Sequence, residues 1–363
     1  KAAAPVISEA AHRASEAAHK AGEWGSAAAH EAGEWAKPRL EQGKASAQPV
    51  FAVANDKTGE LRDRFTGKEA FEGYLAEYNR LFGHLDVYGI WPTWPRLGLD
   101  DRNQWDLYRD LPGGTAALRR LSREARSQGC RFFIAYNPWD KSTRGEDHLS
   151  NMAQIIAETE ADGVVLDTEG SSSPELQQAA DTVRSGVVMY SEGMPVVRDM
   201  PGIVAARVHN ALWLSPELNL NKVIRPDFAI FRVADVGEDV LHREISVAFF
   251  NGYGTELNMF RPGGRGDEFR KDLNYLAQTT YMLRRNSDAF AGGNWTPLIG
   301  SDADRVYVNS WNAGEKQVFT ILNMDHRGYK GSLFSPGDTT GKHLVSLFRH
   351  EELTPAVINN TLT

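Results

Sequence analysis

The chain has 363 residues, a formal net charge of −8, 41% hydrophobic residues and 24% charged residues. These values are ordinary for a soluble globular protein, and the length allows two domains or one large barrel with an appendage. The acidic balance argues against nucleic acid or an anionic membrane as the main partner. No run of about 18 apolar residues predicts a membrane span, and the single cysteine, Cys130, excludes an internal disulfide.

Residues 1–48 differ from the rest because they are rich in Ala, Glu and His and partly repeat, the block at 17–24 recurring at 28–35. They carry six acidic and six basic residues, so the net charge belongs to residues 49–363. Their apolar side chains are too small for a core of their own. We predict a partly helical arm or linker that could dock onto a partner. No secretory signal pattern is recognisable, and we expect an extracellular or periplasmic location rather than a cytoplasmic one.

Residues 49–290 alternate between short, almost continuously apolar runs and helical stretches. Such runs are typical of strands that are buried on both faces of a parallel sheet. The charged run at 101–102, close to Trp105, predicts a solvated loop. The predicted strands are 85–91, 131–137, 163–168, 186–191 and 227–233. The predicted helices are 114–128, 148–160, 174–185, 237–250 and 268–288.

The alternation of strands and helices predicts an α/β fold, for which a (β/α)8 barrel and an open, doubly wound sheet are the two candidates. No glycine-rich nucleotide-binding motif follows an early strand. Polar and aromatic residues instead follow the carboxyl ends of almost all predicted strands, as in barrel enzymes. We therefore predict a (β/α)8 TIM-type barrel over 49–290, with an irregular start near 51–54 or 74–82. Alternating runs at 305–311, 316–323 and 343–348 predict a small C-terminal antiparallel β-sandwich over 291–363.

Two acidic residues end neighbouring predicted strands. Asp167 follows an otherwise apolar strand, and Glu192 follows the next one. A carboxylate at such a position is costly to desolvate unless it faces a polar cleft. Two carboxylates across a sugar-sized cleft are what glycoside hydrolysis requires. Each could instead cap a loop or pair with an arginine, and Glu169 is a competing acid.

Other side chains near the predicted strand ends could bind a sugar, since aromatic rings can stack on sugar faces and polar groups can bond to hydroxyls. The competing interpretation is rim packing for the aromatic residues and structural ion pairing for the charged ones. No metal ion and no organic cofactor are expected, and Cys130 is expected in the core. The predicted substrate-binding residues are Asp86, Tyr88, Trp91, Trp94, Tyr136, Trp139, Asp140, Glu169, Arg207, His209, Arg232 and Glu256.

The stretch from 84 to 323 resembles the (β/α)8-barrel glycoside hydrolases that act on α-linked sugars. This broad group has amylase-like, dextranase-like, α-galactosidase-like and endo-α-N-acetylgalactosaminidase-like members. The sequence Asp162-Gly-Val-Val-Leu-Asp167 matches the hydrophobic strand that ends in the nucleophilic aspartate of several of them. If 85–91 is the second strand, Asp167 and Glu192 follow the fourth and fifth. Val165 stands where amylase-type enzymes have an arginine, so the resemblance is to the group and to no single family.

The resemblance implies a retaining hydrolase with Asp167 as nucleophile and Glu192 as acid/base, acting on an oligosaccharide or glycan. Three other interpretations stay open. The chain could be a catalytically silent carbohydrate-binding barrel, a structural component of a larger assembly docked through the arm at 1–48, or a transglycosidase. The sequence leaves open the sugar, the linkage, endo or exo action, and the oligomeric state.

Overall fold

The computed structural model describes residues 82–90, 102–138, 147–167, 172–208, 220–235, 240–258 and 267–354, with the single positions 76, 79, 80, 140, 357, 358, 361 and 362. All of them belong to one compact unit, Lys68–Thr363. The predicted arm at 1–48 and the predicted barrel start at 51–54 lie outside the described residues. The predicted domain limits near 48 and 290 therefore stay predictions.

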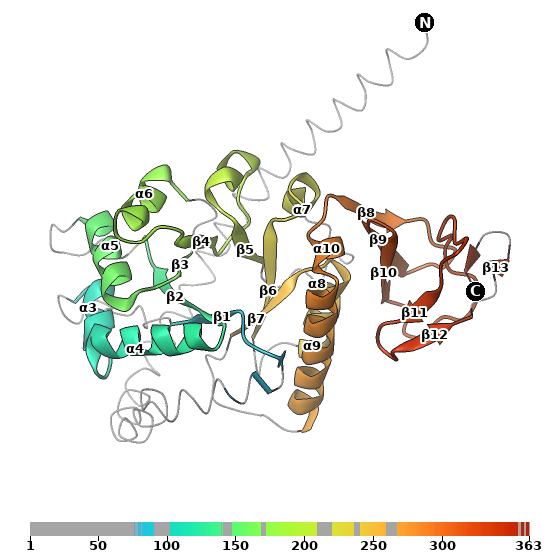
Figure 1. Ribbon diagram of the computed structural model, residues 1–363, viewed down its shortest axis with the longest axis horizontal. Helices are drawn as coiled ribbons and strands as arrows, with labels where there is room; N and C mark the ends of the chain where they lie inside the picture. The colour runs from blue at the N-terminus through green and yellow to red at the C-terminus, as the bar shows by residue number, and fades with distance from the viewer. Residues whose placement is uncertain are drawn as a thin grey trace, which may run out of the picture. The chain divides into compact units, whose positions relative to one another are not determined.

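Seven parallel strands form one sheet, in which each strand pairs with the next strand along the chain (Figure 1). A doubly wound sheet reverses its strand order at a switch point. The order here runs straight through, which excludes that alternative. The five predicted strands are confirmed, whereas β5 and β7 escaped prediction. The strands are β1 (Val87–Gly89), β2 (Arg131–Tyr136), β3 (Gly163–Leu166), β4 (Val188–Ser191), β5 (Ala205–Val208), β6 (Ala229–Asp235) and β7 (Gly254–Asn258).

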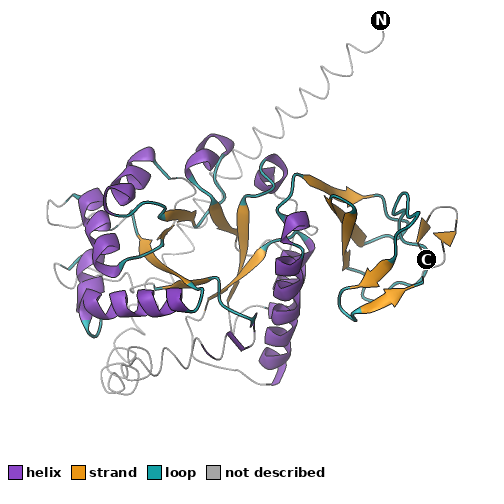
Figure 2. Cartoon of the chain, viewed as in Figure 1, coloured by secondary structure: helices purple, strands orange, loops and turns teal. Residues whose placement is uncertain are grey.

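Helices connect the strands and lie around the outside of the sheet (Figure 2). The five predicted helices are confirmed, with ends that shift by a few residues. Proline begins α6, where its missing N–H group costs no hydrogen bond. The helices are α3 (Gln104–Asp110), α4 (Gly114–Ser127), α5 (His148–Thr159), α6 (Pro174–Val183), the 3₁₀ helix η1 (Val197–Gly202), α7 (Leu220–Ile224), α8 (Leu241–Phe250), α9 (Asp267–Arg285) and α10 (Ser287–Phe290).

Helix α3 escaped prediction, and it begins just after the predicted loop, whose Arg102 is irregular and exposed. The Asn103 side chain accepts the backbone N–H groups of Trp105 and Asp106, and the Asp106 side chain accepts the N–H group of Asn103. This reciprocal capping box satisfies backbone donors that the first turn of a helix leaves open. Trp105 is 1% exposed and stacks on Tyr136, with 5.9 Å between ring centroids. The segment is therefore a core helix.

The two faces of the sheet bury different clusters, because successive side chains of a strand point to opposite faces. On the outer face, Phe132, Ile134 and Leu166 are buried against helices α4, α5 and α6. On the inner face, Phe133 and Tyr190 belong to a separate cluster whose members all come from strands. Among the residues that the structure describes, the helices thus cover one face of the sheet, as in a barrel.

Glycine on two strands, β3 and β7, makes room for rings on the inner face. A Cβ atom added to Gly163 would lie 2.5 Å from the Phe133 ring, and one added to Gly254 would lie 2.6 Å from the Phe231 ring. Phe133 pairs with Gly163 and Phe231 with Gly254 in the strand register. A large and a minimal side chain therefore lie side by side in these two strand pairs, which resembles the layered filling of a barrel interior.

A hydrogen bond across the inner face shows that the sheet is curved. The Tyr190 hydroxyl on β4 donates to Glu256 Oε2 on β7 over 2.5 Å. In a flat sheet these strands would lie about 14 Å apart, three spacings of roughly 4.8 Å, which the two side chains could not bridge so closely. The inner face must therefore be concave, and the sheet is that of an α/β barrel.

Antiparallel strands follow α10. Ala313 pairs with Lys316, so the predicted runs at 305–311 and 316–323 form a hairpin, and Gly314 at its turn has a φ of +57°. The described strands form one three-stranded sheet and two two-stranded ribbons, so a complete sandwich stays a prediction. The strands are β8 (Asn294–Ile299), β9 (Val306–Ala313), β10 (Lys316–Asn323), β11 (Leu344–Ser346), β12 (Glu351–Leu353), β13 (Val357–Ile358) and β14 (Thr361–Leu362).

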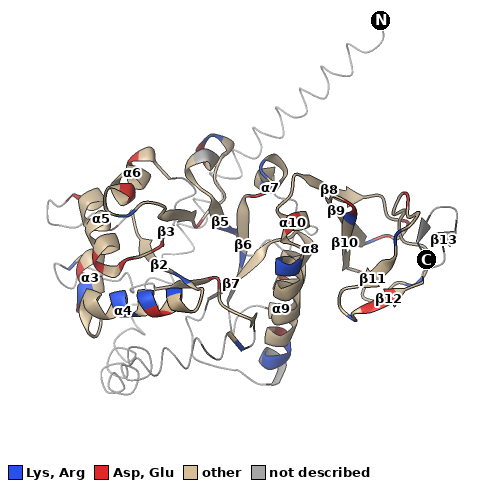
Figure 3. Ribbon diagram, in the orientation of Figure 1, with Lys and Arg blue, Asp and Glu red and all other residues tan. Residues whose placement is uncertain are grey.

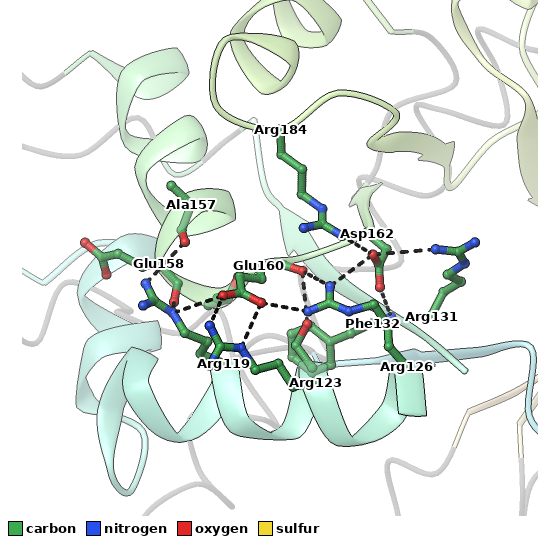
Figure 4. Close-up of polar contacts among 12 residues, drawn as sticks. Arg119, Arg123, Arg126, Arg131, Phe132, Ala157, Glu158, Glu160, Asp162 and Arg184 are labelled. Atoms are coloured by element: carbon green, nitrogen blue, oxygen red, sulfur yellow. Dashed lines mark hydrogen bonds and ion pairs between the residues drawn. The ribbon is translucent and has the colours of Figure 1, made fainter. Parts of the chain in front are cut away.

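An arginine-rich ion-pair cluster lies at the amino end of β3 (Figure 4). Asp162 directly precedes β3 and pairs with Arg126 at 3.2 Å and with Arg184 at 2.7 Å. Glu160 follows α5 and pairs with Arg126 at 2.8 Å and with Arg123. The basic residues of α4 stand out in Figure 3. This amino-end cluster ties α4, α5 and α6 to the start of the sheet.

Candidate active site

Asp167 and Glu192 each extend a strand by one residue at the carboxyl end of the sheet. The Asp167 N–H group donates to the Tyr136 carbonyl at 2.8 Å, and the Glu192 N–H group donates to the Leu166 carbonyl at 3.1 Å. Leu166 pairs with Ser191 in the register of β3 and β4, so the next residue of each strand occupies an equivalent position. The backbone of both acidic residues is thereby fixed by the sheet.

Alternation along the strands places both acidic residues on the inner face, because Val165 and Tyr190, two residues earlier, belong to the inner cluster. Asp167 is 7% exposed and Glu192 is 22% exposed. The prediction that the two residues end neighbouring strands is confirmed. Their catalytic roles stay predictions.

Arg207 on β5 joins Glu192 to a second glutamate. Its Nη2 atom donates to Glu192 Oε1 at 2.5 Å, and its Nη1 atom donates to Glu256 Oε1 at 2.7 Å. The Arg207 side chain is only 3% exposed. Glu256 on β7 also accepts the Tyr190 hydroxyl through its other oxygen. Tyr190, Glu192, Arg207 and Glu256 thus form one hydrogen-bonded group, which we call the inner network.

The charges of the inner network follow from its geometry. Burial raises the pKa of the Tyr190 hydroxyl well above its usual value, and the Glu256 carboxylate adds to the effect, so Tyr190 stays protonated and donates. Burial alone would lower the pKa of the Arg207 guanidinium, but Glu256 and Glu192 outweigh burial and raise it. One guanidinium therefore faces two carboxylates, and Asp167 adds a third on the same face.

Helix α3 holds the carboxyl half of β2. The pairing of β1 with β2 reaches Phe133. Beyond that point, the Tyr108 hydroxyl donates to the Ala135 carbonyl and accepts the Ala135 N–H group, at 2.8 and 2.7 Å. Gln104 bonds in the same way to both backbone groups of Asn137. Two side chains of α3 thus take the place of a neighbouring strand.

Asp140 contributes to the same attachment. Its Oδ2 atom accepts the backbone N–H group of Gln104, the first residue of α3, at 2.6 Å. A carboxylate at a helix N-terminus satisfies an open donor and is favoured by the helix dipole. Asp140 therefore holds the start of α3, and its predicted sugar binding stays a prediction.

Four predicted substrate-binding residues lie away from the inner face and have structural contacts there, and their sugar binding stays a prediction. Asp86 precedes β1 at the amino end of the sheet and pairs with Arg284 of α9 at 2.7 Å. Tyr88 and Tyr136 point to the outer face and pack in the helix-covered core, where burial raises the pKa of Tyr88 to about 12. Arg232 on β6 is fully buried and pairs with Glu244 of α8.

Five further predicted residues lie outside the described residues, so their roles stay predictions: Trp91, Trp94, Trp139, Glu169 and His209. Sequence reasoning missed Tyr190 as a site residue. The available signal was its position two residues before Glu192, which places both on one face of the strand. Cys130 is fully buried, as predicted.

Neither a metal cluster nor a membrane-spanning helix is found in the described part of the chain. Among those residues, no group of three or more His, Cys, Asp or Glu side chains is placed to hold a metal ion. No described helix is both long enough and apolar enough to cross a bilayer.

Comparison with known proteins shows likeness in fold. No protein-family profile matches the chain, and no curated protein sequence does. The chain is similar to a cyclomaltodextrinase, with a TM-score of 0.50 and 13% sequence identity, over 73% of this chain and 64% of that one. It spans, therefore, less than two thirds of that enzyme.

The chain is also similar to AmyP in complex with maltose, with a TM-score of 0.57 and 12% identity, over 80% of this chain and 87% of that one. A variant of AmyP in complex with maltotriose gives a TM-score of 0.57 and 11% identity, with the same coverage. At these identities the likeness establishes the fold. The class defined by the described sheet and by these structures is the α/β barrel of cyclomaltodextrinase and AmyP.

Proposed function

We propose that the protein is a retaining glycoside hydrolase that cleaves an α-linked oligosaccharide or glycan. The observation that carries this proposal is the placement of Asp167 and Glu192 at equivalent positions of neighbouring strands on the concave face. Neighbouring strands are about 4.8 Å apart. Retaining glycosidases have their two carboxyl groups roughly 5–5.5 Å apart, and inverting enzymes roughly 6.5–9.5 Å. A backbone spacing of this size allows the two carboxyl groups to come as close as the retaining mechanism requires.

In the proposed mechanism, an Asp167 oxygen attacks the anomeric carbon while the bond to the leaving oxygen breaks. Glu192 gives its proton to that oxygen, and a glycosyl ester forms on Asp167. In the second step Glu192 takes a proton from water, whose oxygen attacks the anomeric carbon and releases Asp167. The chain's own carboxyl groups supply every proton transfer.

The charge balance of the site supports this chemistry. Glu192 and Glu256 bond to Arg207 on the inner face, and Asp167 lies on the same face. An oxocarbenium-like transition state is positively charged, and a carboxylate beside it stabilises it.

The Arg207 ion pair favours the ionised form of Glu192, which is the form needed to accept a proton from water. The first step requires the protonated form. Desolvation by a bound sugar disfavours the charged form of a carboxyl group and so acts in that direction. Glu192 would thus change its protonation state upon substrate binding.

We further propose that the sheet closes as a (β/α)8 barrel through a strand outside the described residues, and that the C-terminal strands belong to a β-sandwich. The arm at 1–48 would serve as a docking element. Deleting the arm should then abolish association with a partner while hydrolysis is kept.

The test is hydrolysis of 4-nitrophenyl α-glycosides and of maltose and maltotriose, the sugars bound by AmyP. Asp167→Asn should lower turnover by roughly 10³-fold or more, with the fold retained. Asp162→Asn is the matched control, because it changes the other aspartate of the same segment, at its opposite end. Product anomers followed by NMR should show retention.

Near-normal turnover of Asp167→Asn on the best substrate would refute the nucleophile. A wild-type protein that binds these sugars but cleaves none would favour the carbohydrate-binding barrel. Transfer of the sugar to an added acceptor in preference to water would identify a transglycosidase.

A further inference from the structure

We propose that Glu256 is a positioning residue: with Tyr190 it orients Arg207 toward Glu192, and it does not bind the sugar. The inference rests on the proposed role of Glu192 as acid/base. It replaces the predicted substrate-binding role of Glu256.

Glu256 uses both of its carboxylate oxygens within the protein. Oε1 accepts Arg207 Nη1 at 2.7 Å, and Oε2 accepts the Tyr190 hydroxyl at 2.5 Å. These bonds come from two other strands, so the carboxylate is held from two directions. Bonds to a charged donor are about twice as strong as bonds between neutral groups. A sugar hydroxyl would have to compete with both contacts.

Because the guanidinium of Arg207 is rigid, its bond to Glu256 also restricts its bond to Glu192. The donors of arginine lie in one plane at fixed angles. When Nη1 is directed at Glu256, the orientation of Nη2 is restricted, and Nη2 meets Glu192 Oε1 at 2.5 Å. Because Arg207 is almost completely buried, water does not replace a lost partner easily.

The aromatic core anchors the other end of the network. The Tyr190 ring meets Phe133 edge-on at 6.4 Å and Phe231 edge-on at 5.6 Å between centroids. The position of the hydroxyl is therefore set by packing on the inner face. The fixed Tyr190 hydroxyl holds Glu256 in place. Glu256 in turn orients Arg207, and Arg207 orients Glu192.

Glu256 also affects the charge that Glu192 experiences. It shares the positive charge of Arg207, and Asp167 is the further carboxylate on this face. Replacing Glu256 by glutamine removes one negative charge, so Arg207 stabilises ionised Glu192 more strongly. Glu192 would then lose its proton at a lower pH, and the alkaline limb of the activity profile should move to lower pH.

The experiment measures kcat, KM and the pH profile of Glu256→Gln on the best 4-nitrophenyl α-glycoside. We expect kcat to fall about 10- to 100-fold with KM almost unchanged, and the alkaline limb to shift downward. Tyr190→Phe should lower kcat by about 3- to 10-fold. Glu160→Gln, at the amino end of the sheet, is the matched control and should leave kcat and the profile unchanged.

A higher KM with unchanged kcat in Glu256→Gln would identify a sugar ligand and overturn the proposal. An unchanged pH profile, with activity lost only in proportion to the folded fraction, would indicate a structural role and overturn it as well.

A measurement without substrate separates this proposal from the proposed function. The urea midpoints of Glu256→Gln, Tyr190→Phe and the double variant should shift non-additively, since the residues act through one bond. Additive shifts would overturn the network even in an active enzyme. A wild-type protein that cleaves no α-glycoside would refute the proposed function. The comparison of the two single variants with the double variant would still show whether the network exists.

Discussion

Two groups of arginines and carboxylates lie at different places on the same sheet, and their charge balances are opposite. In the amino-end cluster, five arginines surround Glu160 and Asp162. In the inner network, one arginine forms ion pairs with both Glu192 and Glu256. The difference shows which group the fold alone can explain.

The excess cations of the amino-end cluster have structural partners. Arg119 Nε donates to the Glu158 carbonyl at 2.7 Å, and Arg126 Nη1 donates to the Glu160 carbonyl at 2.8 Å. These carbonyls belong to the C-terminal end of α5, where the helix dipole favours positive charge. The cluster is therefore a helix cap and an attachment of α4.

The carboxylates of the inner network lie at a different place on the sheet. They lie on the concave face, at the carboxyl end of the strands, where barrel enzymes build their active sites. Ionisable side chains that gather on such a face are candidates for function. This contrast supports a catalytic assignment for the inner network.

The largest effect on stability and activity should come from removing Arg207. Arg207→Met leaves two carboxylates mostly buried without their cation, so we expect a loss of about 3 kcal/mol in the free energy of unfolding and a loss of turnover. Urea denaturation and steady-state kinetics check this. A stable and active Arg207→Met protein would place the inner network among the structural ion pairs.

Asp162→Asn should have the next largest effect. Asp162 is buried and accepts the Phe132 N–H group at 3.0 Å as well as two arginines. Asparagine keeps an acceptor oxygen but loses the charge, which should cost about 1–2 kcal/mol. Specific activity per folded molecule should not change. A loss of activity larger than the loss of folded protein would contradict the structural role of this cluster.

The pH dependence of the free energy of unfolding should reveal how much the ionised Glu160 side chain contributes to stability. A hydrogen bond from Arg123 lowers the pKa of Glu160 below its usual 4.5, with further help from the charges of neighbouring arginines. Its contribution to stability is thus present above pH 4.5 and is lost as pH falls through the lowered pKa. Glu160→Gln should flatten the decline of the unfolding midpoint below pH 4.5. An identical decline in both proteins would show that the pair contributes nothing.

Arg123→Met should have the smallest effect. The Arg123 side chain is 63% exposed, and exposed ion pairs contribute about 0–1 kcal/mol. We expect a change below 1 kcal/mol that disappears in high salt. A loss as large as that of Arg207→Met would remove the distinction between the two groups.

The strands and long helices could be predicted from sequence, because apolar runs and helix periods mark them directly. Strand β5 (Ala205–Val208) escaped prediction because two alanines and Arg207 leave it without the run of large apolar residues that marked the other strands. Helix α3 carried a readable signal, with Asn103 at the N-cap and Asp106 three residues later. That signal was outweighed by the charges that surround it in the sequence.

The face of each strand was the part of the site that sequence could not provide. Strands buried on both faces lack the polar and apolar alternation that identifies a solvent side. Tyr136 and Arg232 therefore looked equivalent to Asp167, although they point to the helices. Only the pairing register, together with contacts such as Tyr190 to Glu256, shows which positions share the inner face.

The attachment of α3 to the carboxyl end of β2 depends on hydrogen bonds from single side-chain atoms. One phenolic oxygen of Tyr108 both protects the Ala135 amide and satisfies its carbonyl. Hydrogen exchange at that amide will consequently report undocking of the helix rather than separation of β1 from β2. The border of the proposed site can thus loosen at one residue while every strand pair of the sheet remains intact.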